Sequence, residues 1–329
     1  MFITPAVAGR LVIVGSCAGK LLALADSTGD VVWSYDTSVD GSPANFHGDV
    51  LVTEDLVVVG TDTDSIGHLY AFERPTGAVR WKHAFAGGVA SQVLRDRDLA
   101  LAVTQSMEIV AVDLATGVVR WRTPGPPDAD ADNLADPALA ADRLFVGWRA
   151  GWLDAIDSQT GHILWRTSLL GLVNTSVLVV DGEVLVGTLD GFVHRVRASD
   201  GKLIESIDIG GMPFGDLVRA GDHVLVLVKS GETLHRLTAW TPSLDRLAWE
   251  VKAPVEWSSF RPAVHETAVL AGYPGRLLVL DATTGRKLSS CDVSGHPRGL
   301  AWLDDVIYVG LFEGHVLRIE SPTQTPTKH

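Results

Sequence analysis

Eight copies of one sequence pattern divide this chain, and the period of the repeat is the feature that most restricts its fold. A short apolar run ends at intervals of 38 to 45 residues, at Gly15, Gly60, Ala102, Gly147, Gly187, Leu227, Gly272 and Gly310. A second run usually follows with the pattern G-x-L-x-A-x-D-x-x-T-G, as in residues 19–29 and 275–285. Such a period predicts one supersecondary unit per repeat, which buries its faces against its neighbours.

Each unit reads as four short strands. In the fifth unit we expect strands at residues 176–179, 183–186 and 192–196, and a fourth from Lys202. The pair Asp181-Gly182 favours a tight hairpin turn, because such turns need the positive φ that glycine adopts easily. Four-stranded meanders repeated about every 40 residues are typical of β-propellers. The sequence therefore predicts an all-β fold, an eight-bladed β-propeller of four-stranded antiparallel blades.

The repeat leaves no linker, so we expect residues 1–320 to form a single propeller domain. Residues 321–329 then form a C-terminal tail, which is either disordered or the outer edge strand of the last blade. Residues 1–3 are the alternative source of that strand. Because proline is tolerated on an edge strand, Pro322 does not decide between these arrangements.

Composition excludes two classes of partner. The formal net charge of −13 is spread over the repeats rather than gathered in a tail. Nucleic acids and anionic membrane surfaces both require patches of Lys and Arg, so we predict no nucleic acid as a partner. No apolar run reaches about 18 residues, and we therefore expect no membrane insertion.

The segment Val14-Gly15-Ser16-Cys17 is similar to a lipoprotein cleavage site. However, Arg10 interrupts the apolar core that an export signal would need, and no basic region precedes it. Residues 10–15 (RLVIVG) also align with residues 143–147 (RLFVG), which the repeat uses as a strand. We therefore expect a cytoplasmic protein.

A tryptophan recurs four residues after the turn glycine, at Trp33, Trp81, Trp121 and Trp165, with Trp249 in the equivalent place. This T-G-x-x-x-W element resembles the tryptophan-docking repeat of the pyrroloquinoline-quinone (PQQ)-like propeller family over nearly the whole chain. The resemblance implies that each tryptophan packs between adjacent blades. Repeats five and seven depart from the pattern, with Glu205 and Ser289 at the tryptophan position.

The resemblance reaches two kinds of relative. Propeller lipoproteins of outer-membrane β-barrel assembly share the blade number and the docking motif, but they need export. Quinoprotein alcohol dehydrogenases hold PQQ and Ca²⁺ on the propeller axis, and many have a disulfide between adjacent cysteines there. Here Cys17 and Cys291, the only cysteines, lie 274 positions apart (291 − 17). We therefore predict no cofactor, no PQQ-dependent dehydrogenase activity and two buried free thiols, with a disulfide as the alternative.

The repeats differ most at one column. Eleven residues before each repeat end, at the expected start of the first strand, stand Thr4, Asp49, Ser91, Asp136, Ser176, Asp216, Arg261 and Gly299. Innermost strands line the channel of a propeller, so we expect the three aspartates to form a collar at its mouth. They would bind a cation or act as catalytic acid–base groups, while Arg261 pairs with one of them or binds a ligand carboxylate. Alternatively, the column only hydrogen-bonds neighbouring backbone.

Loop residues on the same face complete a predicted ligand-binding site. We assign to it, besides Arg261, the residues His47, Asn174, Trp148, Trp257, Tyr273 and Lys229. Aromatic walls with a few polar groups suit a small molecule, and the same residue types are common in protein-binding faces. We predict no metal site, because the acidic loop 128–133 lacks the glycine and glutamate of an EF-hand loop.

Two functions remain open at this point. The first is a cytoplasmic binding module or scaffold that uses the loop-rich face and the channel mouth to bind a small molecule or a protein. The second is a cofactor-independent enzyme, such as a cyclase, lyase or isomerase of a specialised metabolic pathway, that uses the aspartate collar. The first requires no special residues, and we therefore favour it.

Overall fold

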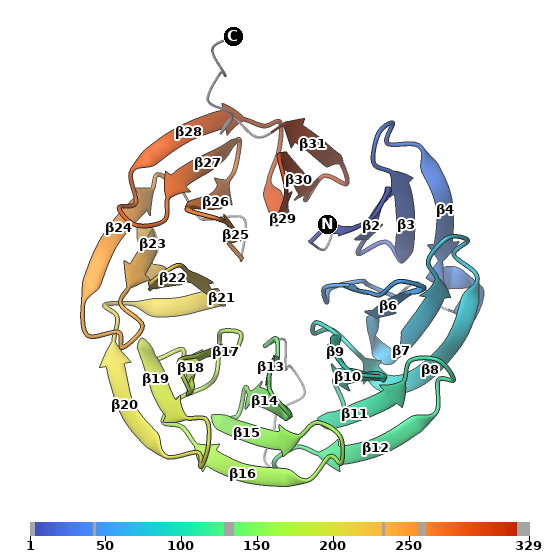
Figure 1. The fold of residues 1–329 in the computed structure, drawn as a ribbon, viewed down its shortest axis with the longest axis horizontal. Coiled ribbons are helices and arrows are strands. Elements are labelled where there is room, and N and C mark those ends of the chain that lie inside the picture. The colour runs from blue at the N-terminus through green and yellow to red at the C-terminus, as the bar shows by residue number, and fades with distance from the viewer. Residues whose placement is uncertain are drawn as a thin grey trace.

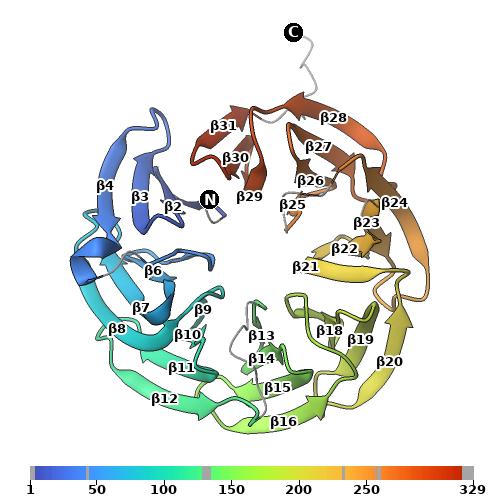
Figure 2. The same ribbon diagram turned by 180° about the vertical axis from the view of Figure 1, so that it is seen from behind.

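The computed structural model describes residues 4–41, 44–127, 135–231, 234–255, 257 and 261–320. These residues form a ring of eight antiparallel sheets, arranged radially around a central axis (Figure 1). Figure 2 shows the ring from behind, where the first strands (blue) lie beside the last ones (red). The predicted all-β, eight-bladed propeller is confirmed.

The first four blades each contain one meander of four strands. The first blade has β1 (Ala6–Ala8), β2 (Leu11–Gly15), β3 (Lys20–Ala25) and β4 (Val31–Asp36), followed by a 3₁₀ turn, η1 (Thr37–Asp40). The second has β5 (Leu51–Val52), β6 (Leu56–Gly60), β7 (Asp62–Glu73) and β8 (Val79–Gly88). The third has β9 (Leu94–Asp96), β10 (Leu99–Val103), β11 (Glu108–Asp113) and β12 (Val119–Pro124). The fourth has β13 (Ala138–Ala140), β14 (Arg143–Trp148), β15 (Trp152–Asp157) and β16 (Ile163–Ser168).

The last four blades continue the same order. The fifth has β17 (Leu178–Val180), β18 (Glu183–Gly187), β19 (Phe192–Arg197) and β20 (Leu203–Asp208). The sixth has β21 (Met212–Ala220), β22 (His223–Ser230), β23 (Leu234–Trp240) and β24 (Leu247–Ala253). The seventh has β25 (Ala263–His265), β26 (Ala268–Tyr273), β27 (Arg276–Asp281) and β28 (Lys287–Asp292). The eighth has β29 (Pro297–Leu303), β30 (Val306–Leu311) and β31 (Val316–Glu320), and the expected alternatives for its outer strand lie outside the described residues.

The five repeat tryptophans dock between blades, as the resemblance implied. Nε1 of Trp249 in the sixth blade donates to the Ala282 carbonyl of the seventh at 3.0 Å. Each of the other four bonds the next blade in the same way, at 2.8 to 3.2 Å. A Cβ on the turn glycine Gly285, whose φ is +69°, would lie 2.6 Å from the Trp249 ring. Glycine is therefore required there both by the turn and by the ring that packs on it.

Each docking tryptophan also lies directly opposite an alanine of its own blade. Ala239 pairs with Trp249, and the other four tryptophans have the same partner type. The two departing repeats change both members of the pair. In the fifth blade Arg195 lies opposite Glu205 and forms an ion pair with it at 3.1 Å, and in the seventh Val279 lies opposite Ser289.

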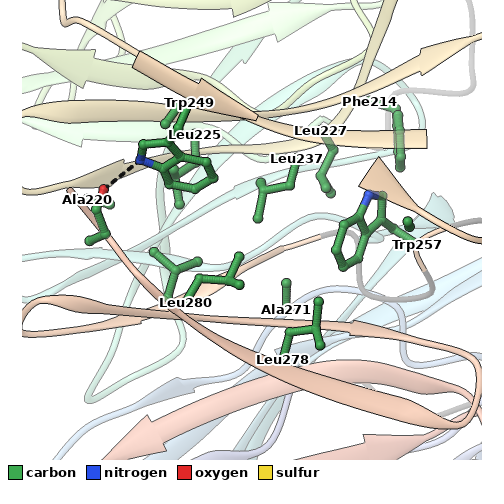
Figure 3. Close-up of a cluster of buried hydrophobic side chains, with 14 residues drawn as sticks. Phe214, Ala220, Leu225, Leu227, Leu237, Trp249, Trp257, Ala271, Leu278 and Leu280 are labelled. Carbon is green, nitrogen blue, oxygen red and sulfur yellow. Dashed lines mark hydrogen bonds between the residues drawn. The ribbon is translucent and has the colours of Figure 1, made fainter. Parts of the chain in front are cut away.

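The hydrophobic core is divided among the seams between blades. One cluster lies at each of the eight seams, and the cluster between the sixth and seventh blades contains fourteen buried residues (Figure 3). Among the described residues, the cluster between the last and first blades contains only Val12, Val14 and Tyr308 as buried members. A cavity of about 460 Å³ lies at this last seam, between residues such as Leu22 and Val316.

The meander gives the ring two different faces. Because successive strands run in opposite directions, the connections from second to third strand and from one blade to the next lie on one face. We call it the loop face; it includes residues 16–19, 44–50, 61, 89–93, 169–177, 261–262, 293–296 and 312–315. The opposite turn face carries the remaining connections, including residues 26–30, 74–78, 114–118, 158–162, 181–182 and 282–286.

Candidate functional site

Three predicted aspartates and Arg261 gather at the centre of the ring, on the side of the loop face. Asp49 and Asp136 precede the inner strands β5 and β13, Asp216 lies in β21, and Arg261 precedes β25. The inner strands lie nearest the axis of the ring, so side chains from distant parts of the sequence meet there (Figure 1). The geometry therefore brings together the column that differs most between repeats.

Arg261 connects blades that are not neighbours. Its Nη1 lies 3.2 Å from Oδ2 of Asp49, and its Nε lies 3.3 Å from Oδ2 of Asp216. Nη1 also donates to the side-chain oxygen of Gln92 at 3.4 Å. Asp49 and Gln92 belong to the second and third blades and Arg261 to the seventh, so the guanidinium reaches across the centre of the ring. The chain's own arginine thus supplies a positive charge inside the collar.

Gln92 extends this network to the third aspartate, because its backbone N–H donates to Oδ1 of Asp136 at 2.6 Å. Burial, together with the nearby carboxylates of Asp216 and Asp49, raises the pKa of Asp136 to about 8. Burial also raises the pKa of Asp216 to about 6, while the positive charge of Arg261 opposes the shift. The pKa of Asp49 is raised by burial as well, again against Arg261. Buried carboxylates next to one another resist ionisation for both reasons.

The collar can therefore hold a proton at neutral pH. Asp136 is mostly protonated there, while the single positive charge of Arg261 offsets part of the charge of its two carboxylate partners. Among the described residues, no group of three or more His, Cys, Asp or Glu side chains is arranged to hold a metal ion. The predicted acid–base role of Asp49, Asp136 and Asp216 stays a prediction, as does ligand binding by Arg261.

Two of the predicted loop residues have structural partners. Nδ2 of Asn174 donates to the Pro213 carbonyl at 2.8 Å and so ties its loop to the following blade. Trp148 is fully buried between the third and fourth blades, and its Nε1 donates to Oδ2 of Asp154 at 2.9 Å. The indole of Trp148 therefore lies in the core rather than on the surface of the loop face.

Trp257 and Tyr273 lie together at the seam between the sixth and seventh blades. Their rings meet edge to face with centroids 5.8 Å apart, and Trp257 is buried within the cluster of Figure 3. Within the described part of the chain, the buried Nε1 of Trp257 has no hydrogen-bond partner. Tyr273 and Lys229 are half-buried. Their predicted role in ligand binding stays a prediction.

His47 has partners that the sequence did not indicate. Its Nε2 lies 3.2 Å from Sγ of Cys17, and its Nδ1 lies 3.0 Å from Oδ2 of Asp62. One signal was available, because Cys17 and Asp62 each stand two residues after a repeat end and therefore belong to the loop face. Cys17 and Cys291 are both free, as expected, but both are half-buried rather than fully buried.

Two further expectations concern the acidic loop and a membrane-spanning segment. The acidic loop 128–133 lies outside the described residues. Within the residues that the structure describes, no helix is long and apolar enough to cross a membrane.

Comparison with known proteins gives a consistent family. The family profile described as outer membrane protein assembly factor BamB matches residues 2–147 and 130–306. BamB of Yersinia pestis is 24% identical over 241 residues, which cover 69% of this chain and 59% of the relative. The chain thus spans less than two thirds of that relative's length.

Solved structures agree on the fold. The crystal structure of BamB from Moraxella catarrhalis superposes with a TM-score of 0.77 at 19% identity, covering 97% of this chain and 96% of that chain. Quinohemoprotein alcohol dehydrogenase from Comamonas testosteroni gives a TM-score of 0.69 at 15% identity, covering 93% and 69%. At these identities the likeness concerns the fold alone.

The prediction of a cytoplasmic location is wrong by this comparison, because the profile and the curated relatives are factors of outer-membrane assembly, which points to the cell envelope. The physical reason is that strand register constrains the fold and not the destination. Residues 10–15 do contribute to a buried strand, β2, yet that fact does not decide where the chain is delivered. The two profile matches together extend over residues 2–306, and this chain therefore belongs to the outer membrane protein assembly factor BamB family of PQQ-like propellers.

Proposed function

We propose that this propeller is a protein-binding scaffold of outer-membrane assembly in the cell envelope, and that its loop face is the docking surface. The family supports a role in assembly. A propeller can serve as a binding module through its surface alone, because such a role requires no catalytic residues. The observation that carries the choice of face is the exposure of large apolar side chains in its loops.

Five exposed apolar side chains of the loop face break the repeat. They are Val39, Leu170, Leu172, Val255 and Phe312, and Leu170 is 77% exposed. Other exposed apolar side chains, such as Val118 and Leu247, recur at the start of the outer strand in successive blades. Those recurring positions belong to the architecture of the seven blades whose outer strand is described, whereas the loop-face positions are particular to single loops. Exposed apolar side chains of this kind are typical of protein-binding surfaces.

Site-specific photo-crosslinking in the living host tests the proposal. A crosslinking amino acid at Leu170 or Phe312 should capture outer-membrane proteins or other assembly factors in the envelope fraction. The matched control is the same amino acid at Val118, which is 57% exposed and lies on the opposite turn face. Equal capture from Val118 and Leu170, or recovery of the chain outside the envelope fraction, would contradict the proposal.

A further inference from the structure

A cysteine, a histidine and an aspartate form a chain of contacts on the loop face, apart from the aspartate collar. Sγ of Cys17 lies 3.2 Å from Nε2 of His47. On the other side of the imidazole, Nδ1 of His47 lies within 3.0 Å of both carboxylate oxygens of Asp62. A nucleophile, a base and a group that orients the base in this order are the signature of an activated nucleophile.

Backbone contacts hold the three residues in place, although they come from different loops. The N–H of Phe46 donates to the Ser16 carbonyl at 3.3 Å, which joins the loop of Cys17 to that of His47. Asn45 and Asp62 exchange two backbone hydrogen bonds, of 2.9 and 3.0 Å, which join the loop of His47 to the start of β7. Backbone hydrogen bonds therefore join the loop of His47 to the loop of Cys17 on one side and to Asp62 on the other. Sites held in this way are pre-organised for reaction.

The three side chains remain accessible from the loop face. Cys17 is half-buried, and the side chains of His47 and Asp62 are 31% and 18% exposed. A small electrophile can therefore reach the sulfur from solvent.

The protonation of the resting state follows from the surroundings. Burial raises the pKa of the Cys17 thiol, and the charge of Asp62 raises it as well, against the opposing charge of Arg298. The thiol therefore rests protonated at neutral pH. Because Asp62 accepts the Nδ1–H of His47, Nε2 is left free to accept the thiol proton. The base must then act during attack rather than hold a thiolate in advance.

We propose that Cys17, His47 and Asp62 form a nucleophilic centre that accepts acyl groups from small esters or thioesters. Cys17 Sγ attacks the acyl carbon as its proton passes to Nε2 of His47. The bond from the acyl carbon to the leaving oxygen or sulfur then breaks, and the leaving group takes the proton from His47. The product is a thioester on Cys17, and no oxidant, reductant or metal is consumed. Asp62 keeps the imidazole in the reactive tautomer.

The chain supplies its own control thiol. Cys291 lies in β28 opposite Leu277, it is also half-buried, and burial raises its pKa too. No histidine contact of Cys291 is found among the described residues. A difference in reactivity between the two thiols therefore isolates the contribution of His47 and Asp62.

Acylation by p-nitrophenyl acetate tests the proposal on the full chain. With Cys291→Ser as the background, Cys17 should release one equivalent of p-nitrophenol and gain one acetyl group by mass spectrometry. At pH 7 it should react at least 10-fold faster than Cys291 in the Cys17→Ser variant. His47→Gln should slow acylation roughly 100-fold or more, and Asp62→Asn roughly 10-fold. His296→Gln, which alters another histidine–carboxylate pair of the loop face, is the matched control and should leave the rate unchanged.

Rescue by pH separates general-base action from a merely structural effect. At a pH high enough to ionise the thiol without a base, His47→Gln should recover most of the lost rate. Equal rates for Cys17 and Cys291, or no loss in His47→Gln at pH 7, would overturn the proposal. A rate in His47→Gln that stays low at high pH would also overturn it, because the loss would then come from misfolding or blocked access. None of these outcomes depends on protein docking to the loop face.

Discussion

Two sets of aspartates in this ring have opposite pKa shifts. On the turn face, Asp113 begins a D-x-x-T-G turn and accepts hydrogen bonds at 2.6 Å from Arg120 and at 2.9 and 2.8 Å from the N–H and hydroxyl of Thr116. These contacts lower the pKa of Asp113 to about 2. On the loop face, burial raises the pKa of Asp136 to about 8. The same residue type is therefore held ionised on one face and protonated on the other.

The difference separates aspartates at positions that recur in the repeat from aspartates at positions that vary. Asp157 and Asp281 occupy the same turn position as Asp113, and threonine three residues later also bonds each of them. These aspartates are satisfied by their own turn. Those of the collar rely on Gln92 and Arg261, which come from other blades. Positions that recur stabilise a blade locally, and positions that vary depend on the closed ring.

The largest expected effect comes from Asp136→Asn. Its pKa is about 8 in the folded chain against an ordinary 3.8, so the folded state keeps a proton that the unfolded state loses. Stability must then fall as the pH rises from about 4 to about 8, with the whole cost present above pH 8. Since each pKa unit is worth about 1.4 kcal/mol and the collar shares its protons, we expect the variant to be stabilised by about 2–4 kcal/mol at pH 9.

Urea unfolding at several pH values measures this effect. The gain should disappear near pH 4, where the wild-type side chain is protonated as well. A variant that is equally or less stable than the wild type at pH 9 would show that Asp136 is ionised without cost, and the contrast between the two faces would fail.

Asp113→Asn should have a smaller effect of the opposite sign. A folded pKa of about 2 lies below the ordinary 3.8, so the carboxylate stabilises the fold above about pH 4 and loses this contribution between about pH 4 and pH 2. We expect a loss of about 1–2 kcal/mol at pH 7, because a charge-assisted pair with Arg120 and two bonds from Thr116 are weakened. Thermal unfolding at pH 7 and at pH 2 checks both predictions, and an equal loss at the two pH values would contradict the electrostatic cause.

The smallest expected effect is the coupling free energy between Asp136→Asn and Asp113→Asn in the double variant. If the two faces are independent, the changes in unfolding free energy should add to within about 0.5 kcal/mol at any pH. A double-mutant cycle at pH 7 measures the coupling. A coupling above about 1 kcal/mol would mean that the turn and the collar communicate through the blade.

The architecture could be predicted because it repeats. Asp181-Gly182 forms the predicted turn with φ values of +50° and +83°, and Trp249 docks as its motif implied. Aligning the copies also brought out the collar residues, since these positions stand at the same distance from their repeat ends. Contacts between loops of different blades, such as Cys17 with His47, follow no period and were missed. The cellular location was predicted wrongly because strand register carries no information on targeting.

The seam between the last and first blades has a mechanical consequence. Only three described side chains are buried in it, and polar contacts of Asp26 with Tyr308 and, at 3.2 Å, with Arg318 close its outer part. In a closed ring every blade depends on the seams on both of its sides, so the ring should open at the seam with the fewest stabilising contacts. We expect the backbone amides at this seam to exchange their hydrogens first, and the opening of this seam to limit the rate at which the ring becomes a linear array of blades.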